Sequence, residues 1–436
     1  MSARIVLGVG AGIAAYKSCE LLRLLTESGH HVRVVPTHDA LRFVGEATWA
    51  ALSGEPVTTD AWTGVAEVPH VRLGQSADLV LVAPATADLM ARAAAGMAGD
   101  LLTAILLTAR CPVVYAPAMH TEMWEHPATQ ANVALLRSRG AVVLEPAVGR
   151  LTGADSGAGR LPEPAEIFAV ATRLLVRGAQ QGAESGGPLR PDLAGRRVVV
   201  SAGGTREEID PVRFIGNWST GTQGYALART AVARGAEVIV VAANVALPDP
   251  AGAKVVRVVS AREMRDAVTA AAAQGGQRAH GGDGGHGAHG GHGVGADAVV
   301  MAAAVADYRP QARSQAKIKK DGQPPEPLLL TENPDILAGL AVRRAQQPGH
   351  QVLVGFAAET DTSAEGARAK LARKGCDLLV VNPVGNGLGF GTADNEAVVY
   401  GADGTVTQIP RGPKEALADV VWDLVVSRLE QLVSRP

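Results

Sequence analysis

The chain has 436 residues, of which 47% are apolar and 19% charged, and its formal net charge at pH 7 is −2. This length exceeds what one hydrophobic core usually serves, and the near-neutral charge excludes the basic surface typical of nucleic-acid-binding proteins. Three cysteines without disulfide or metal-ligand spacing, no apolar stretch of membrane-spanning length and an N-terminus without a secretory signal predict a cytoplasmic protein. We therefore expect two domains with small-molecule substrates, no nucleic-acid partner and no membrane.

In the first half of the chain, short apolar strands alternate with helices rich in Ala and Leu. The expected strands are Ile5–Val9, His31–Pro36, Leu79–Ala83, Val113–Ala116 and Val142–Glu145. The expected helices are Ala14–Ser28, Ala87–Ala94, Leu101–Thr108 and Ala128–Arg139. Such alternation specifies a parallel sheet with helices on both of its faces, so the sequence predicts a Rossmann-like α/β domain over residues 1–176.

Residues 177–192 are rich in Gly, Gln, Ser and Pro and are predicted to form a linker. The alternation then resumes. The expected strands are Val198–Ser201, Val238–Ala242, Val255–Val258, Ala298–Ala302, Val352–Phe356 and Leu378–Val381. A second α/β domain with a parallel sheet is therefore predicted over residues 193–436.

The end of the chain has a different pattern. Ala397–Tyr400 and Val406–Ile409, around Asp403–Gly404, are expected to form an antiparallel hairpin, and Lys414–Val433 is expected to form the last helix. Residues 275–295 are low in complexity and rich in Gly and His. Such a segment buries no apolar surface, so we expect a disordered surface insertion that activity does not require.

Short motifs follow the strands of the first half at their carboxyl ends, where an open α/β sheet binds its ligand. They are Gly8–Lys17, Thr37, Ala83–Asp88 and Pro117–Trp124. Taken together over residues 3–170, they resemble the homo-oligomeric flavin-containing cysteine decarboxylases. The resemblance implies a flavodoxin-like domain that binds FMN, with its phosphate near the first turn and its ring near the third strand. The implied FMN contacts are Gly10, Gly12, Ile13, Thr37, Ala83, Pro84 and Thr86.

The same resemblance implies two histidines in the decarboxylase site. His70 falls where the family keeps its active-site base. An imidazole with a pKa near neutral suits the removal of a proton while hydride leaves the substrate for the flavin. Met119 and His120 are implied to contact the substrate, and His120 stands where the family usually has the Asn that contacts the substrate carboxylate.

The flap of this domain, Leu151–Arg160, departs from the family pattern. Gly153 stands where the family generally has a Cys that protonates the enethiolate. Either another group, such as Asp155 or a bound water, delivers the proton, or this half of the chain is impaired. We favour another donor, because the rest of the site is intact.

The second half carries a longer set of motifs, which begins with a Gly-rich turn after its first strand. The motifs are Ser201–Arg213, Asn217–Gly221, Ala302–Tyr308, Lys317–Lys320, Asn333–Ile336 and Gly355–Thr360. From Leu193 to about Val433, they resemble the phosphopantothenate–cysteine ligase domain. The whole chain therefore resembles the bifunctional decarboxylase/ligases of coenzyme A biosynthesis. The resemblance implies CTP-dependent ligation of L-cysteine to 4′-phosphopantothenate through an acyl-cytidylate, then FMN-dependent decarboxylation to 4′-phosphopantetheine.

A triphosphate requires cations and a metal at its oxygens, and the resemblance assigns residues to each role. The implied CTP contacts are Ala304, Asp307, Lys317, Asn333, Pro334, Asp335, Ile336, Phe356, Lys370 and Lys374. Asp307 is also the implied Mg²⁺ ligand, Lys317 neutralises the phosphates, and Asn217 contacts the acyl-cytidylate. Gly203, Gly204 and Thr205 are expected to receive the substrate phosphate. Thr222 and Gln223 follow the Asn217–Gly221 motif where a Lys is common.

Two other hypotheses stay open. One is a nucleotide-sugar or nicotinamide enzyme with two Rossmann-like halves, although no GxGxxG motif with a downstream acidic residue supports it. The other is a ligase whose flavin domain has lost catalysis and serves as an assembly scaffold, as the missing flap Cys allows. The family resemblance also implies a homododecamer of decarboxylase trimers and ligase dimers.

Overall fold

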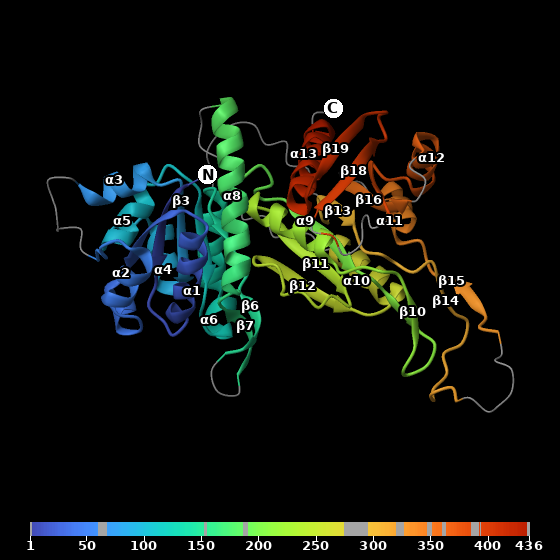
Figure 1. The fold of residues 1–436 in the computed structure, drawn as a ribbon, viewed down its shortest axis with the longest axis horizontal. Coiled ribbons are helices and arrows are strands. Elements are labelled where there is room, and N and C mark those ends of the chain that lie inside the picture. The colour runs from blue at the N-terminus through green and yellow to red at the C-terminus, as the bar shows by residue number, and fades with distance from the viewer. Residues whose placement is uncertain are drawn as a thin grey trace. The chain divides into compact units, whose positions relative to one another are not determined.

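The computed structural model describes residues 2–59, 68–151, 155–185, 191–273, 295–319, 327–346, 351–359, 363–384, 392 and 394–433. The chain divides into two compact units, each built on its own sheet (Figure 1). The first unit is made of Met1–Gly195, Ala231–Glu237 and Pro248–Ala253, and the second of Arg196–Thr230, Val238–Leu247 and Lys254–Pro436. The domain boundaries at residues 176 and 193 stay a prediction. The Gly- and His-rich insertion lies almost wholly outside the described residues.

The first unit contains a sheet of five parallel strands, in the order β2-β1-β3-β4-β5. The strands are β1 (Arg4–Val9), β2 (His31–Pro36), β3 (Leu79–Ala85), β4 (Val113–Pro117) and β5 (Val142–Val143). This is the flavodoxin-like strand order, in which the sheet grows in one direction from β1 and then in the other. The predicted parallel α/β architecture is confirmed.

Helices cover both faces of this sheet, because successive strand side chains point to opposite faces. The helices are α1 (Ala15–Glu27), α2 (Glu46–Ser53), α3 (Pro69–Ser76), α4 (Ala87–Ala95), α5 (Leu101–Thr108), α6 (Thr121–Glu125), α7 (Pro127–Ser138), α8 (Pro164–Ser185) and the 3₁₀ helix η1 (His38–Arg42). Val80 and Val82 pack against α4, α5 and α7, whereas α1 and α8 contact β3 and each other. A capping box begins α5: the Asp100 carboxylate accepts from the Thr103 N–H at 2.7 Å, and the Thr103 hydroxyl accepts from the Asp100 N–H at 3.1 Å.

Two features of this unit differ from the sequence-based expectation. Helix α8 continues to Ser185, so the first part of the segment predicted as a linker is helical. The apolar residues Ile167, Val170 and Leu174 are buried along the first part of the helix, and the extension begins at the buried Arg177, whose guanidinium lies 3.1 Å from the carboxylate of Asp192. The second feature is an antiparallel hairpin of β6 (Ala147–Arg150) and β7 (Ser156–Arg160), which forms the flap.

The second unit contains an eight-stranded sheet in the order β12-β11-β8-β13-β16-β17-β18-β19. The strands are β8 (Arg197–Gly203), β11 (Glu237–Ala243), β12 (Ala253–Val258), β13 (Ala298–Met301), β16 (Val352–Glu359), β17 (Leu378–Pro383), β18 (Asp394–Gly401) and β19 (Val406–Pro413). Strands β8, β13, β16 and β17 pair in parallel, and β18 and β19 are antiparallel additions at the edge. The predicted C-terminal hairpin is confirmed, and the first six strands have the Rossmann order.

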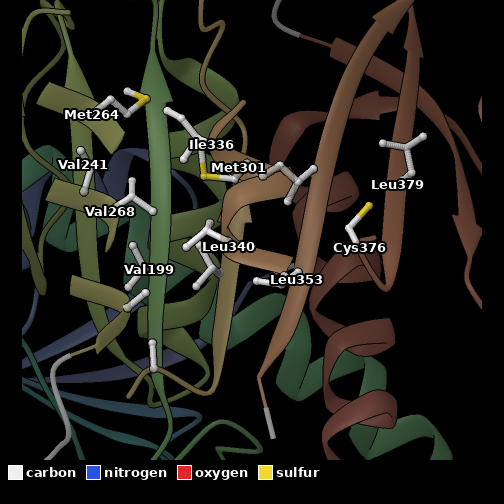
Figure 2. Packing of buried hydrophobic residues seen from close by; sticks show 14 of the residues in the cluster. Val199, Val241, Met264, Val268, Met301, Ile336, Leu340, Leu353, Cys376 and Leu379 are labelled. Carbon is white, nitrogen blue, oxygen red and sulfur yellow. The ribbon is translucent and has the colours of Figure 1, made fainter. Parts of the chain in front are cut away.

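The core of the second unit lies between this sheet and its helices (Figure 2). The helices are α9 (Thr222–Ala233), α10 (Ala261–Ala273), α11 (Ile336–Gln346), α12 (Ala364–Lys374) and α13 (Lys414–Val433). Figure 2 shows Val199 of β8 and Leu353 of β16 facing apolar side chains such as Leu340 of α11. Two small ribbons project from the sheet: β9 (Arg206–Glu208) with β10 (Phe214–Gly216), and β14 (Tyr308–Pro310) with β15 (Leu330–Glu332).

Candidate functional site

The first unit has its topological switch point between β1 and β3, where an open α/β sheet forms a crevice at its carboxyl edge. There the N–H of Gly10 donates to the carbonyl of Pro84 at 3.0 Å. A Cβ on Gly10 would lie 2.6 Å from that oxygen, so only glycine fits this turn. Thr86 follows at once and caps α4 through the N–H of Leu89. The fold therefore brings together three of the predicted flavin contacts.

Thr37 stands beside this turn, because its N–H donates to the carbonyl of Val9, the last residue of β1, at 2.9 Å. Its hydroxyl is buried and has no hydrogen-bond partner among the residues that the structure describes. A buried hydroxyl without a partner is unfavourable, so a bound group with hydrogen-bond acceptors would stabilise it. A phosphate has such acceptors, so the residues at this edge fit a flavin mononucleotide. Ile13 is exposed beside the turn.

The flap lies directly on the loop that carries Met119 and His120. The N–H of Met119 donates to the carbonyl of Gly159 in β7 at 2.9 Å. A Cβ on Gly159 would lie 2.2 Å from the Met119 oxygen, and one on Gly157 would lie 2.3 Å from Oγ1 of Thr121. Two flap glycines thus allow a contact that side chains would prevent. His120 is exposed at the start of α6, and Gly153 lies outside the described residues.

Glu163, just after the flap, joins it to the rest of the unit. Its carboxylate is paired with the guanidinium of Arg160 in β7 and with Nζ of Lys17 in α1, the latter at 3.3 Å. Lys17 lies in the first turn of α1, the helix that follows the Gly10 turn, so this pair of contacts fixes the flap relative to the predicted flavin site.

His70 is placed differently. It lies in the first turn of α3, where its carbonyl accepts from the hydroxyl of Thr108 at 2.8 Å. Its Nδ1 is buried without a partner in the described ranges. None of its hydrogen bonds there leads to the Gly10 turn or to Thr37. Within one chain, therefore, these contacts do not bring the predicted base to the predicted flavin site.

The second unit has its switch point between β8 and β13, and the Gly-rich turn Gly203–Thr205 follows β8 there. The N–H groups of Gly204 and Thr205 donate to the carbonyls of Ala243 and Ala304, at 3.1 and 3.2 Å. The hydroxyl of Thr205 accepts from the N–H of Ala306 at 2.9 Å. The N–H groups of Gly204 and Thr205 thus form hydrogen bonds within the protein, whereas the O–H of Thr205 can still donate, and the predicted phosphate contact stays a prediction. Gly203 has a φ of +82° and closes the turn.

A cavity of about 810 Å³ opens beside that turn. Its walls include all the predicted CTP contacts except Lys317, and also Asn217: they are Asn217, Ala304, Asp307, Asn333, Pro334, Asp335, Ile336, Phe356, Lys370 and Lys374. Gly203, Gly204 and Thr205 are not among its described lining residues, whereas the loop and helix start at 216–224 are. The sequence also missed Asn382, Asn395 and Lys414, which line the cavity without belonging to any predicted motif.

Hydrogen bonds order the polar walls of this cavity. Nδ2 of Asn217 donates to the carbonyl of Val305 at 3.0 Å, and Nδ2 of Asn333 donates to that of Ala306 at 2.9 Å. The N–H of Asn333 donates to the carbonyl of Asp307 at 2.8 Å. Two motifs far apart in the sequence are thereby tied to the segment that carries Asp307, and the Asp307 side chain is exposed.

Two of the lysines that line the cavity, Lys370 and Lys374, are paired with carboxylates. Nζ of Lys370 lies 2.6 Å from Glu359, and Nζ of Lys374 lies 2.6 Å from Asp335. Both lysines come from one face of α12, as their spacing of four residues predicts. The arrangement suits an anionic ligand that exchanges with these carboxylates.

Comparisons with known proteins give the family. Residues 1–175 match the family model Flavoprotein, and residues 193–276 and 291–429 match the DNA/pantothenate metabolism flavoprotein C-terminal domain. The coenzyme A biosynthesis bifunctional protein CoaBC of Mycobacterium tuberculosis strain H37Rv is 56% identical over 434 residues, which cover 98% of this chain and 97% of that protein.

The chain belongs to the CoaBC family. A more distant CoaBC protein, from Vibrio cholerae, is 39% identical and covers 97% of both chains. A crystal structure of the C-terminal domain of a CoaBC protein is 33% identical, with a TM-score of 0.43, and covers 55% of this chain and 99% of that chain. As a CoaBC protein, the chain is a bifunctional enzyme of coenzyme A biosynthesis with a flavoprotein half, as the sequence predicted. Across the described ranges, no helix is long and apolar enough to cross a membrane.

Lys317 of this CoaBC chain is the predicted CTP contact that lies outside the described cavity lining. Its neighbour Ile318 is held on both sides: its N–H donates to Oδ2 of Asp210 at 3.2 Å, and its carbonyl accepts from Nη2 of Arg213 at 2.6 Å. Desolvation opposes the ionisation of Asp210, but hydrogen bonds from the N–H groups of Val212, Ile318 and Arg213 outweigh it and lower the pKa to about 2. Asp210 and Arg213 therefore fix the segment that carries Lys317.

Proposed function

We propose that the second unit uses CTP and Mg²⁺ to ligate L-cysteine to 4′-phosphopantothenate, and that the first unit uses FMN to decarboxylate the product to 4′-phosphopantetheine. Membership of the CoaBC family supports both reactions. The observation that carries the ligase assignment is one cavity that gathers the predicted nucleotide contacts other than Lys317 from three separate motifs and helix α12. The proposed boundaries of the two domains are residues 1–176 and 193–436, with a linker between them.

In the ligase reaction, a carboxylate oxygen of 4′-phosphopantothenate attacks the α-phosphorus of CTP, and pyrophosphate leaves. The cysteine amine then attacks the acyl carbon of the cytidylate, loses a proton and displaces CMP. Lys370 and Lys374 exchange Glu359 and Asp335 for phosphate oxygens, and Asn217 contacts the acyl-cytidylate. Lys317 adds a further cation to the phosphates.

Asp307 fits the proposed Mg²⁺ role. Its carboxylate is exposed on the cavity wall, and magnesium sites with nucleotides commonly use one or two carboxylates together with phosphate oxygens. The described residues contain no cluster of three or more metal-ligating side chains, so the phosphates supply the remaining ligands. The ion would neutralise the charge that develops on pyrophosphate.

In the decarboxylase reaction, bound FMN would supply a reversible hydride acceptor, from which the hydride returns after carbon dioxide has left, so that the conversion is redox-neutral. Thr37 and the Gly10 turn would hold the flavin phosphate, and Ala83–Thr86 would contact the ring. His70 removes a proton, and Met119 and His120 hold the substrate with His120 at its carboxylate. Asp155 or a water molecule returns a proton to the enethiolate. Since the contacts of His70 within one chain lead away from the flavin site, we propose that it acts on a flavin bound to a neighbouring subunit.

The proposed assembly follows from that placement. Decarboxylase trimers with active sites between subunits, joined by ligase dimers, give a homododecamer in the cytoplasm. Sedimentation of the purified protein tests this proposal, and a stable, fully active monomer contradicts it.

The proposed function is tested by incubating the purified chain with 4′-phosphopantothenate, L-cysteine, CTP and Mg²⁺ and identifying the products by mass spectrometry. We expect 4′-phosphopantetheine, CMP and pyrophosphate. Accumulation of 4′-phosphopantothenoylcysteine without carbon dioxide release identifies a ligase with a scaffold flavin domain, the alternative that Gly153 raises. If neither product forms, the proposal is wrong.

A further inference from the structure

Lys414 occupies a position that is unfavourable for a lysine on structural grounds alone. It is the first residue of α13, where the helix dipole favours acidic rather than basic side chains. It is only 4% exposed, although lysines are almost never fully buried unless they are paired. Burial lowers the pKa of its ammonium against the opposing effect of Glu415 and Asp394. Residues that break local rules in this way are often explained by ligand binding.

The protein compensates this buried charge only in part. Nζ of Lys414 donates to the carbonyl of Thr392, and no carboxylate lies within ion-pair distance of it in the described part of the chain. Glu415, its neighbour, is instead 3.7 Å from Arg229. Lys370 and Lys374, the other lysines among the described residues of the same cavity, each have a carboxylate at 2.6 Å. Lys414 therefore differs from them in lacking an anionic partner.

The surroundings of Lys414 are rich in hydrogen-bond donors. Nε2 of Gln223, in the first turn of α9, donates to the Lys414 carbonyl at 3.2 Å, and Oε1 of Gln223 accepts from Asn395 at 3.2 Å. All three residues line the cavity. The hydroxyls of Thr220 and Thr222, 2.7 Å apart, begin the same helix. Lys414 thus lines the same cavity as two hydroxyls and a helix N-terminus, and this combination of groups is the chemistry that binds a phosphate.

We propose that Lys414 binds a phosphate group of a ligase substrate, either the triphosphate of CTP or the phosphate of 4′-phosphopantothenate. This inference rests on the proposed ligase function of the cavity. It assigns a substrate-binding cation to the start of α13, far in sequence from every predicted nucleotide contact. The alternative is a purely structural role, in which Lys414 serves only as a donor to the Thr392 carbonyl.

Two substitutions separate these roles in the full-length protein. Lys414→Gln keeps a donor for the Thr392 carbonyl but removes the charge, whereas Lys414→Met removes both. Lys414→Arg keeps the charge. The matched control is Lys254→Met, which removes an exposed lysine of the same unit, in β12.

Ligase rates are measured by pyrophosphate release at varied CTP, 4′-phosphopantothenate and L-cysteine. We expect Lys414→Gln and Lys414→Met to raise KM for one phosphorylated substrate by about tenfold or more, the size of a lost charge-assisted hydrogen bond, with KM for cysteine unchanged. Lys414→Arg restores most of the loss, and Lys254→Met behaves as the wild type. A raised KM for CTP with weaker inhibition by inorganic pyrophosphate identifies the triphosphate, and a raised KM for 4′-phosphopantothenate alone identifies the other source.

The inference is overturned if Lys414→Gln leaves KM for both phosphorylated substrates unchanged, or raises only KM for cysteine. If Lys414→Met does not fold, Lys414→Gln decides alone, and decarboxylation of 4′-phosphopantothenoylcysteine by each variant reports on the other half of the chain. Failure of the wild type to ligate with CTP contradicts the proposed function itself. An active wild type with an unaffected Lys414→Gln variant contradicts only the role of Lys414.

Discussion

At the residue scale, Thr37 in the first unit and Asp210 in the second differ in how many hydrogen-bond partners their side chains have. Thr37 presents a buried hydroxyl without a protein partner among the described residues, and Asp210 collects N–H donors from two segments that are a hundred residues apart. The hydroxyl of Thr37 needs a ligand to provide a hydrogen-bond partner, whereas the carboxylate of Asp210 already has its partners within the protein. Substitutions at the two positions therefore have opposite expected signatures.

Thr37→Val is expected to weaken flavin binding without destabilising the flavin-free protein. Valine has nearly the same shape and removes a buried hydroxyl that has no partner, so the free energy of unfolding of the flavin-free protein stays equal or rises. The dissociation constant for FMN rises about tenfold, because a hydrogen bond to a charged group contributes about 1.5–3 kcal/mol. Fluorescence titration of flavin-free protein and thermal unfolding measure the two effects.

Thr26→Val is the control for that experiment. Its hydroxyl bonds only to carbonyls of its own helix α1, so flavin affinity stays at the wild-type value. Equal affinity of the Thr37→Val variant and the wild type for FMN would falsify the proposed phosphate contact.

Asp210→Asn is expected to destabilise the second unit in a pH-dependent way. The pKa of Asp210 in the folded protein is about 2, below its ordinary value of 3.8. A carboxyl with a depressed pKa contributes its stability fully above the ordinary value, and the contribution disappears as pH falls toward the folded value. The difference in thermal midpoint between wild type and variant is therefore largest at neutral pH and shrinks below about pH 4.

The ligase activity of the Asp210→Asn variant is also expected to fall, because the segment with Lys317 loses its anchor through Ile318. Asp266→Asn is the control: it removes an exposed carboxylate of α10 whose pair with Arg265 is worth little on the surface. A thermal-midpoint difference that stays constant from pH 7 to pH 3 contradicts the assigned role of the carboxylate.

At the scale of elements, the flap hairpin packs against the Met119–Thr121 segment only because two of its residues are glycines. Strand β7 reaches the Met119–Thr121 segment so closely that Gly157 and Gly159 have no room for a Cβ. Glu163 then holds the end of the hairpin through Arg160 and Lys17. Backbone contacts with the Met119–Thr121 segment therefore hold the flap, and the ion pairs of Glu163 hold its end.

Gly159→Ala is expected to move the flap away from the Met119–Thr121 segment. Its φ of +152° and the 2.2 Å approach to the Met119 carbonyl make alanine unfavourable by about 1–3 kcal/mol. We expect decarboxylation of 4′-phosphopantothenoylcysteine to slow at least about tenfold while CTP-dependent ligation is unchanged. Gly178→Ala, at an open position in α8, is the control and keeps both activities. A Gly159→Ala variant with normal decarboxylation shows that the flap contact is not required.

At the scale of the whole molecule, both sheets have a topological switch point with predicted ligand contacts at its edge. In each sheet the order in which strands are added reverses at a switch point, which lies beside β1 in the first unit and beside β8 in the second. Predicted ligand contacts lie at the carboxyl edge of the sheet at both points. The two sheets have different strand orders, flavodoxin-like in the first unit and Rossmann in the second, and different loops follow their strands. Two chemistries that need separate ligands are thereby carried by one polypeptide.

The local sequence determined much of this fold, because strands and helices follow from the spacing of apolar residues along short stretches of the chain. The predicted strand His31–Pro36 and the helices Leu101–Thr108 and Lys414–Val433 have the predicted bounds. Motifs after strands also reach the correct edge, since parallel strands place all their carboxyl ends together. The predicted nucleotide contacts other than Lys317 therefore meet in one cavity.

Contacts between distant segments were decided only by the tertiary structure. That the N–H groups of Gly204 and Thr205 donate to the carbonyls of Ala243 and Ala304 is seen only in the tertiary structure, and the predicted phosphate contact of Gly203–Thr205 stays a prediction. Lys414 gave no signal as a ligand contact, because only the return of α13 to the sheet brings it to the cavity. Which donors already have partners and which charges stay unpaired depends on neighbours from about 20 to nearly 200 residues away, and no local pattern records them.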